Sequence, residues 1–122
     1  MKILIVDDSE LIRERLISLL KGTKEFEIVG QSKNAEEAID FVNQNEIDIV
    51  ILDIRLPDKN GLQVLEMIKK TKPETKVIML TNYPFPQYMK KSEELGADFF
   101  IHKVSEFNRV SQIFKNLKEE IV

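Results

Sequence analysis

The 122 residues, 43% of them hydrophobic and none of them cysteine, suit one compact domain over residues 1–122 whose core needs no disulfide or structural metal. The 18 basic side chains are scattered among 21 acidic ones for a net charge of −3, which argues against direct binding to nucleic acid. No apolar run reaches the roughly 20 residues of a membrane span, and a strand begins directly after Met1, so we expect a cytoplasmic domain with no signal peptide and no membrane contact.

Five apolar runs separated by helix-length segments predict the order βαβαβαβαβα, because runs without polar alternation are typical of strands buried on both faces. The first helix, residues 9–21, has one apolar face and ends at Gly22. Asn34 is the expected N-cap of the second helix, with Glu36 and Glu37 placed to complement its dipole. The expected strands cover residues 2–6, 26–29, 49–52, 77–80 and 99–101.

The second half of the chain continues the alternation of strand and helix. A polar loop over residues 54–61 leads into the third helix, and Gly61 permits a close backbone approach there. Pro86 is well placed as the first residue of the fourth helix, and the last helix is expected to start at about Ser105. Right-handed crossovers then favour an α/β fold with a doubly wound, five-stranded parallel sheet of order 2-1-3-4-5 and five helices, the flavodoxin-like arrangement.

Polar side chains follow the strands at the edge where this order would bring them together. Asp7 and Asp8 follow the first strand, and Asp53 follows the third, its neighbour in the sheet. Thr81 and Lys103 follow the fourth and fifth strands, and open α/β folds bind their ligands at this carboxyl edge. Helix capping or turn formation could explain each acid alone, but three carboxylates in one cluster suit a hard cation such as Mg²⁺. A carboxylate beside such a cation can attack phosphorus to form an acyl phosphate, so this cluster is the expected functional site.

Four segments, which together span nearly the whole chain, are residues 4–8 (LIVDD), 53–61 (DIRLPDKNG), 77–81 (VIMLT) and 96–103 (GADFFIHK). They resemble the receiver domains of two-component response regulators, of which the stand-alone chemotaxis regulator is the simplest relative. The resemblance implies a single receiver domain that takes a phosphoryl group from a sensor histidine kinase or a phosphotransfer protein. Its output would be a downstream protein or an effector domain absent from this chain.

The resemblance also implies a role for each residue of the cluster. Asp53 would be the phosphoacceptor, because it matches the acid that carries the phosphoryl group in the family. Lys103 would pair with the phosphoryl group, and Thr81 would supply the hydroxyl that responds to it. The implied Mg²⁺ ligands are Asp7, Asp8, Asp53 and the backbone carbonyl of Arg55.

A second set of implied residues concerns switching and timing. Phosphorylation would draw the Thr81 hydroxyl inward and admit the ring of Phe100 into the space released. This would change the surface around the fourth helix, fifth strand and fifth helix, which the resemblance also makes a candidate homodimer surface. Arg55 and Tyr83, two residues beyond Asp53 and Thr81, lie at positions similar to those that tune the lifetime of the phosphorylated state in the family.

Two positions depart from the family's pattern. The family usually has proline after the lysine, whereas Val104 follows Lys103 here. A cis bond before valine costs about 2.5–4 kcal/mol, so we expect a trans bond. Asn82 stands where the family commonly has a small residue. His102, the only histidine, should point away from the Lys103 side chain in an extended strand and is not expected to act in catalysis.

Other function classes remain open on the sequence. A Mg²⁺-dependent aspartyl-phosphate phosphohydrolase would use the same nucleophile, but Arg55 stands two residues after Asp53, where such enzymes often carry a second acid. A flavin or nucleotide binder of similar fold would need a phosphate cradle where residues 7–10 form an acidic loop. A receiver that signals by binding alone would not need the full set of acids, hydroxyl and lysine. Self-phosphorylation and slow self-dephosphorylation are therefore the expected catalysis.

Overall fold

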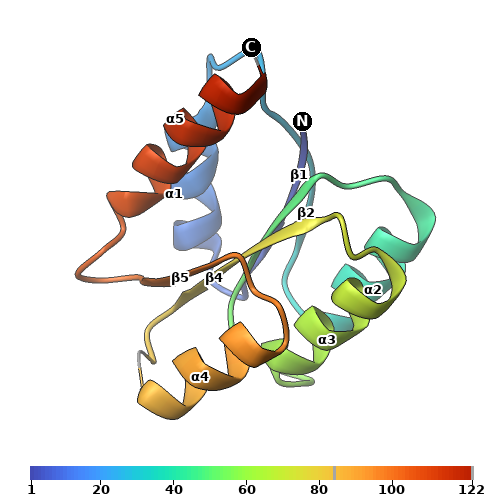
Figure 1. The fold of residues 1–122 in the computed structure, drawn as a ribbon. Helices are drawn as coiled ribbons and strands as arrows, with labels where there is room; N and C mark the ends of the chain where they lie inside the picture. The colour runs from blue at the N-terminus through green and yellow to red at the C-terminus, as the bar shows by residue number, and fades with distance from the viewer. Residues whose placement is uncertain (84, 122) are drawn as a thin grey trace.

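Strands and helices alternate along the chain, as the pattern of apolar runs predicts. The structure, a computed structural model, describes residues 1–83 and 85–121. The five strands form one parallel sheet in the order β2-β1-β3-β4-β5, which confirms the predicted topology (Figure 1). The elements are β1 (Lys2–Val6), α1 (Glu10–Leu20), β2 (Glu27–Ser32), α2 (Ala35–Gln44), β3 (Ile49–Leu52), α3 (Gly61–Thr71), β4 (Lys76–Thr81), α4 (Pro86–Glu94), β5 (Phe99–His102) and α5 (Arg109–Ile121).

The sheet is covered on both faces, with α1 and α5 on one side and α2, α3 and α4 on the other (Figure 1). Side chains alternate between the two faces of a strand. Ile3 and Ile5 of β1 therefore pack in the core beneath α1 and α5, whereas Leu4 and Val6 pack in the core on the opposite face. Because both faces are buried, such a strand requires a continuous apolar run.

The pairing of β1 with β3 determines where the acidic side chains leave the sheet. Val6 pairs with Leu52 at the carboxyl ends of these two strands, so Asp7 and Asp53 follow at adjacent positions. The backbone N–H of Asp53 donates to the carbonyl of Val6 at 3.0 Å, which continues the ladder by one bond. The sheet topology therefore places these two acids side by side.

Helix starts follow the capping signals of the sequence. Asn34 Oδ1 accepts the N–H of Glu37 at 2.8 Å, which confirms the predicted N-cap of α2. The Ser9 hydroxyl accepts the N–H of Ile12 at 3.3 Å at the start of α1, and Pro86 is the first residue of α4, as expected. Within the described ranges, none of these helices combines the length and apolar composition that a membrane crossing requires.

The predicted start of the last helix is wrong. This helix begins at Arg109 rather than at about Ser105. The Glu106 carboxylate accepts the N–H of His102 at 3.1 Å, and the N–H of Glu106 donates to the carbonyl of His102 at 3.0 Å. The segment therefore closes a turn against the end of β5 before a helix can start. Just before this turn, the peptide bond that precedes Val104 is trans, as expected, since the described residues contain no cis bond.

The predicted end of the second strand is also wrong. β2 covers Glu27–Ser32 rather than residues 26–29. A register shift after Ile3 lets Gly30 and the two residues that follow it pair with the second half of β1. Because β2 lies at an edge of the sheet and this part is polar, the apolar pattern does not reveal the pairing.

Candidate functional site

The ammonium group of Lys103 lies between two carboxylates at the carboxyl edge of the sheet. Its Nζ is 2.6 Å from Asp7 Oδ2 and 2.8 Å from Asp53 Oδ2, and the three side chains are at most 6% exposed. The backbone N–H of Lys103 donates to the carbonyl of Thr81 at 2.8 Å, at the end of β4. The fold therefore brings the ends of four strands together, as the sequence predicts.

The charges of this cluster do not balance. Asp7, Asp53 and the exposed Asp8 provide three carboxylates against the one ammonium group. Burial raises the pKa of Asp53, and the hydrogen bond and charge of Lys103 oppose this only in part. Burial lowers the pKa of Lys103, but its hydrogen bonds and charge interactions with Asp53 and Asp7 outweigh burial, so its pKa is raised and it stays protonated. The cluster can therefore accommodate a further positive charge.

One oxygen of Asp53 has no partner among the described residues. Lys103 donates to Oδ2, whereas the buried Oδ1 accepts no hydrogen bond. Asp7, by contrast, has both oxygens engaged, because Oδ1 accepts the N–H of Ser9 at 2.9 Å and Oδ2 meets Lys103. Buried polar atoms are nearly always hydrogen-bonded in native proteins, so the free Oδ1 indicates a place for a ligand.

The three acids can hold a metal ion. Asp7, Asp8 and Asp53 each offer one oxygen, and these oxygens lie within 4.8 Å of one another. Mg²⁺ binds through one or two carboxylates and keeps several waters, so a cluster of carboxylates with an unpaired oxygen fits it. The backbone carbonyl of Arg55 stays a predicted ligand.

The loop after β3, residues 53–60, is closed at its base. Arg55 and Asn60 form an isolated antiparallel bridge, and the Asn60 side chain caps α3 by accepting the N–H of Leu62 at 2.8 Å. A Cβ atom on Gly61 would collide with the backbone carbonyl of Asp53. This confirms the predicted close approach and explains why only glycine fits directly behind the acid.

The residues predicted to switch and to tune the site lie around the end of β4. The Thr81 side chain is fully buried, and its hydroxyl accepts the N–H of Tyr83 at 3.0 Å. The guanidinium carbon of Arg55 lies 4.3 Å from the centroid of the Tyr83 ring. Phe100 is half-buried against the core beneath α2, α3 and α4. The sequence assigns Arg55 and Tyr83 the same expected role but predicts no contact between them, and the fold places them in contact.

Sequence reasoning missed two residues that hold the loops of the site. Arg13 Nη1 donates to the backbone carbonyl of Asp7 at 2.7 Å, and Asp58 binds backbone N–H groups of α2. The sequence offered one indication of the role of Arg13, namely its position near the start of α1, the helix that follows Asp7 and Asp8. His102 takes no part in the cluster, because its Nδ1 lies 2.6 Å from Ser105 Oγ, in agreement with the expected orientation.

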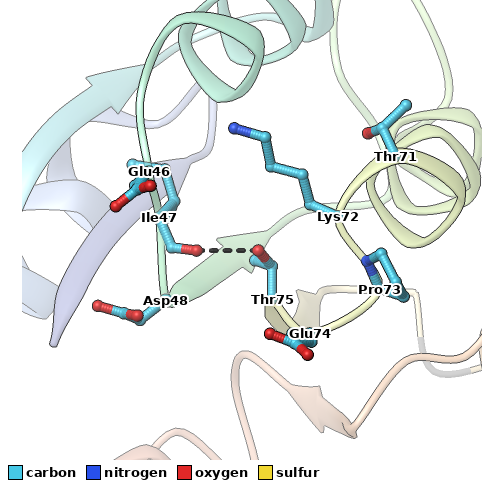
Figure 2. A pocket seen from close by; sticks show the side chains of 8 residues that line it. All are labelled: Glu46, Ile47, Asp48, Thr71, Lys72, Pro73, Glu74 and Thr75. Atoms are coloured by element: carbon cyan, nitrogen blue, oxygen red, sulfur yellow. Dashed lines mark hydrogen bonds between the residues drawn. The ribbon is translucent and has the colours of Figure 1, made fainter.

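A pocket of about 570 Å³ lies at the opposite edge of the sheet, where the chain leads into β3 and β4 (Figure 2). Lys72 Nζ donates to the carbonyls of Val42 and Asn45 at 2.6 and 2.8 Å. The Thr75 hydroxyl donates to the carbonyl of Ile47 at 2.8 Å, as the dashed line in Figure 2 shows. The protein itself satisfies these groups, and the pocket shares no residue with the cluster around Lys103.

Comparisons with known proteins agree with this geometry. A family model described as the response regulator receiver domain matches residues 3–115. The sensory transduction protein LytT of Bacillus anthracis is 37% identical over 120 residues, which cover 98% of this chain and 48% of LytT. The transcriptional regulatory protein BtsR of Salmonella typhi is 36% identical over 119 residues, which cover 98% of this chain and 48% of BtsR. The chain thus spans about half the length of the curated relatives it matches.

Solved structures give the same result for the fold. The crystal structure of a CheY-like response regulator receiver domain protein from Methanospirillum hungatei JF-1 superposes with a TM-score of 0.85 at 29% identity, covering 97% of this chain and 94% of that one. Since the family model spans nearly all of the chain and the strand order, the acidic cluster and the lysine agree with it, the chain belongs to the response regulator receiver domain family.

Proposed function

We propose that the chain is a phosphorylatable receiver in which Asp53 takes a phosphoryl group from a histidine of a sensor kinase or a phosphotransfer protein. The observation that carries this proposal concerns the Asp53 carboxylate. Lys103 donates to Oδ2, whereas the buried Oδ1 accepts no hydrogen bond among the described residues. An anchored carboxylate with one free oxygen suits a nucleophile that must attack phosphorus in line. The names of LytT, a sensory transduction protein, and BtsR, a transcriptional regulatory protein, agree with a signalling role.

The transfer step is a displacement at phosphorus. Asp53 Oδ1 forms the new O–P bond while the N–P bond of the donor phosphohistidine breaks, and the electron pair leaves with the imidazole nitrogen, which takes up a proton. Lys103 keeps its positive charge beside Asp53 and stabilises the charge on the phosphoryl oxygens. Asp7, Asp8 and Asp53 would hold Mg²⁺, which would supply positive charge against the repulsion between the two anionic reactants.

The readout begins at Thr81. Its hydroxyl accepts the N–H of Tyr83, so its own proton stays available to donate to a phosphoryl oxygen. A rotation of Thr81 towards that oxygen releases space for the half-buried ring of Phe100. The movement changes the surface of α4, β5 and α5, which would meet a downstream protein, an effector domain or a second copy of the chain.

Incubation with acetyl phosphate, a small phosphodonor, tests the proposal on the full chain. We expect intact mass spectrometry to find one added phosphoryl group in the presence of Mg²⁺ and none in the presence of EDTA. The absence of uptake under both conditions would contradict the proposal. Continuous release of inorganic phosphate over many turnovers, with no build-up of phosphorylated protein, would favour the phosphohydrolase instead.

Replacing Arg55 or Tyr83 by alanine is expected to shorten the lifetime of the phosphorylated state. Arg55, in the loop that follows Asp53, stacks on Tyr83. In this proposal the stacked pair shields the phosphoryl group from attacking water. A cation–π contact at an exposed site is worth about 0.5–1 kcal/mol, so hydrolysis is expected to become about two- to fivefold faster. The release of phosphate after removal of the donor measures this rate.

The exposed Lys59 of the same loop offers a matched control, and Lys59→Ala is expected to leave the hydrolysis rate unchanged. The double variant of Arg55 and Tyr83 is expected to hydrolyse no faster than the faster single variant, because either change breaks the same contact. Equal rates in the wild type and all variants would show that the stacked pair does not protect the phosphoryl group.

A further inference from the structure

The carboxylate of Asp58 reaches from the loop after β3 to the start of α2. Its Oδ1 accepts the N–H of Ala35 at 2.8 Å, and its Oδ2 accepts the N–H of Glu36 at 2.9 Å. Oδ1 also accepts the N–H of Lys59 at 3.0 Å. The contact therefore joins the first turn of α2 to a loop 22 and 23 residues further along the chain.

Asp58 completes the capping of α2. The first N–H groups of a helix have no partner within the helix. Asn34 takes the N–H of Glu37, so Asp58 supplies the acceptors for the N–H groups of Ala35 and Glu36. The bond from Ala35 contributes most to lowering the pKa of Asp58, which keeps this exposed carboxylate ionised at the positive end of the helix dipole.

Both ends of this contact are structurally defined. On the side of α2, Ala35 and Ala38 are fully buried in the core, which makes the start of the helix a firm anchor. On the side of the loop, Arg55 bridges Asn60 at the base, and Asp58 lies between these two residues. The bonds to α2 therefore give a second support to the loop that the bridge of Arg55 and Asn60 closes at its base.

We propose that Asp58 is a positioning residue for phosphoryl transfer: by tying the loop to α2, it keeps the backbone carbonyl of Arg55 where it can join the acidic cluster around Mg²⁺. This inference rests on the proposed function and adds to it a support outside the cluster. Three backbone N–H groups engage the Asp58 carboxylate, so it acts through the loop rather than as a ligand. Without Asp58, the acidic cluster and the Arg55 carbonyl are in place together in a smaller fraction of molecules. The apparent affinity for Mg²⁺ then falls in proportion to that fraction.

Two variants of the full chain test the inference. Asp58→Ala removes both bonds to α2, whereas Asp58→Asn keeps one oxygen that can accept one N–H. We expect amide hydrogen exchange at Ala35 and Glu36 to become about fivefold faster in Asp58→Ala. Calorimetric titration with MgCl₂ is expected to give a dissociation constant raised about tenfold in Asp58→Ala and by less in Asp58→Asn.

Asp40, an exposed acid on the same helix, provides matched controls, and Asp40→Ala and Asp40→Asn are expected to change neither measurement. Far-UV circular dichroism verifies that every variant folds. Faster exchange with unchanged Mg²⁺ affinity in Asp58→Ala would reduce Asp58 to a helix cap and overturn the inference. Unchanged amide hydrogen exchange at Ala35 and Glu36 in Asp58→Ala would overturn the inference as well, because the contact between Asp58 and α2 would then contribute nothing in solution.

The wild type separates this inference from the proposed function. If the wild type binds no Mg²⁺ and takes up no phosphoryl group, both fail. If the wild type does both and Asp58→Ala binds Mg²⁺ equally well, only the positioning role of Asp58 is wrong.

Discussion

Asp53→Asn is expected to abolish the uptake of a phosphoryl group from acetyl phosphate in the presence of Mg²⁺. The amide is uncharged and cannot form the acyl phosphate that a carboxylate nucleophile forms. The variant preserves the size and shape of the side chain, which separates the loss of chemistry from a loss of folding. Intact mass spectrometry measures the outcome as one added phosphoryl group in the wild type and none in the variant.

Asp40→Asn is the matched control for this change, because Asp40 is an exposed acid on α2, outside the cluster. It is expected to take up one phosphoryl group like the wild type. If Asp53→Asn still gained a phosphoryl group at the rate of the wild type, the acceptor would be another residue and the proposed function would be wrong at its centre.

Asp53→Asn is also expected to be at least as stable as the wild type without Mg²⁺. Burial raises the pKa of Asp53 above its ordinary value of 3.8, so the native state binds this proton more tightly than the unfolded state does. The free energy of unfolding therefore falls as the pH rises from that value through the raised pKa. At neutral pH the ionised carboxylate costs stability, and a neutral amide removes that cost.

Lys103→Met is expected to lower the free energy of unfolding by about 3–5 kcal/mol at neutral pH without Mg²⁺. Methionine retains the apolar length of the side chain but leaves Asp7 and Asp53 buried together without the ammonium group that they share. The deficit is expected to shrink as the pH falls, because burial raises the pKa of Asp53, the loss of Lys103 removes what opposes that rise, and Asp53 then takes up a proton in the native state. Urea unfolding at neutral and mildly acidic pH measures both effects.

Lys70→Met provides the control for Lys103→Met. The ion pair of Lys70 with Glu66 on α3 is 73% and 47% exposed, and such surface pairs contribute about 1 kcal/mol or less. A loss in Lys103→Met no larger than the loss in Lys70→Met would show that the two buried carboxylates do not depend on the shared ammonium group for stability. Lys103→Met is also expected to take up the phosphoryl group poorly, because it lacks the positive charge beside Asp53.

Much of the fold could be predicted because short-range patterns encode it. Apolar runs without alternation identify strands buried on both faces, and the crossover rule then orders them. Once the order is known, the acids that follow β1 and β3 must lie at one edge, so the sequence predicts that Asp7 and Asp53 meet, and the pairing of β1 with β3 confirms it. The end of β2 at Ser32 could not be predicted, because the last residues of this edge strand are polar. The start of α5 at Arg109 could not be predicted, because it depends on the hydrogen bond between the Glu106 carboxylate and the N–H of His102.

The order of the strands, the acidic cluster and the close backbone approach at Gly61 can all be predicted from the amino-acid sequence. Which side chains touch becomes visible only in the folded chain, where Arg55 stacks on Tyr83 and Asp58 reaches α2. Each contact joins segments that are distant in the sequence, and a hydrogen bond forms only when donor and acceptor come within about 3 Å in a suitable direction. Periodicity specifies which face of an element is buried, whereas such distances depend on how the packed elements place their connecting loops.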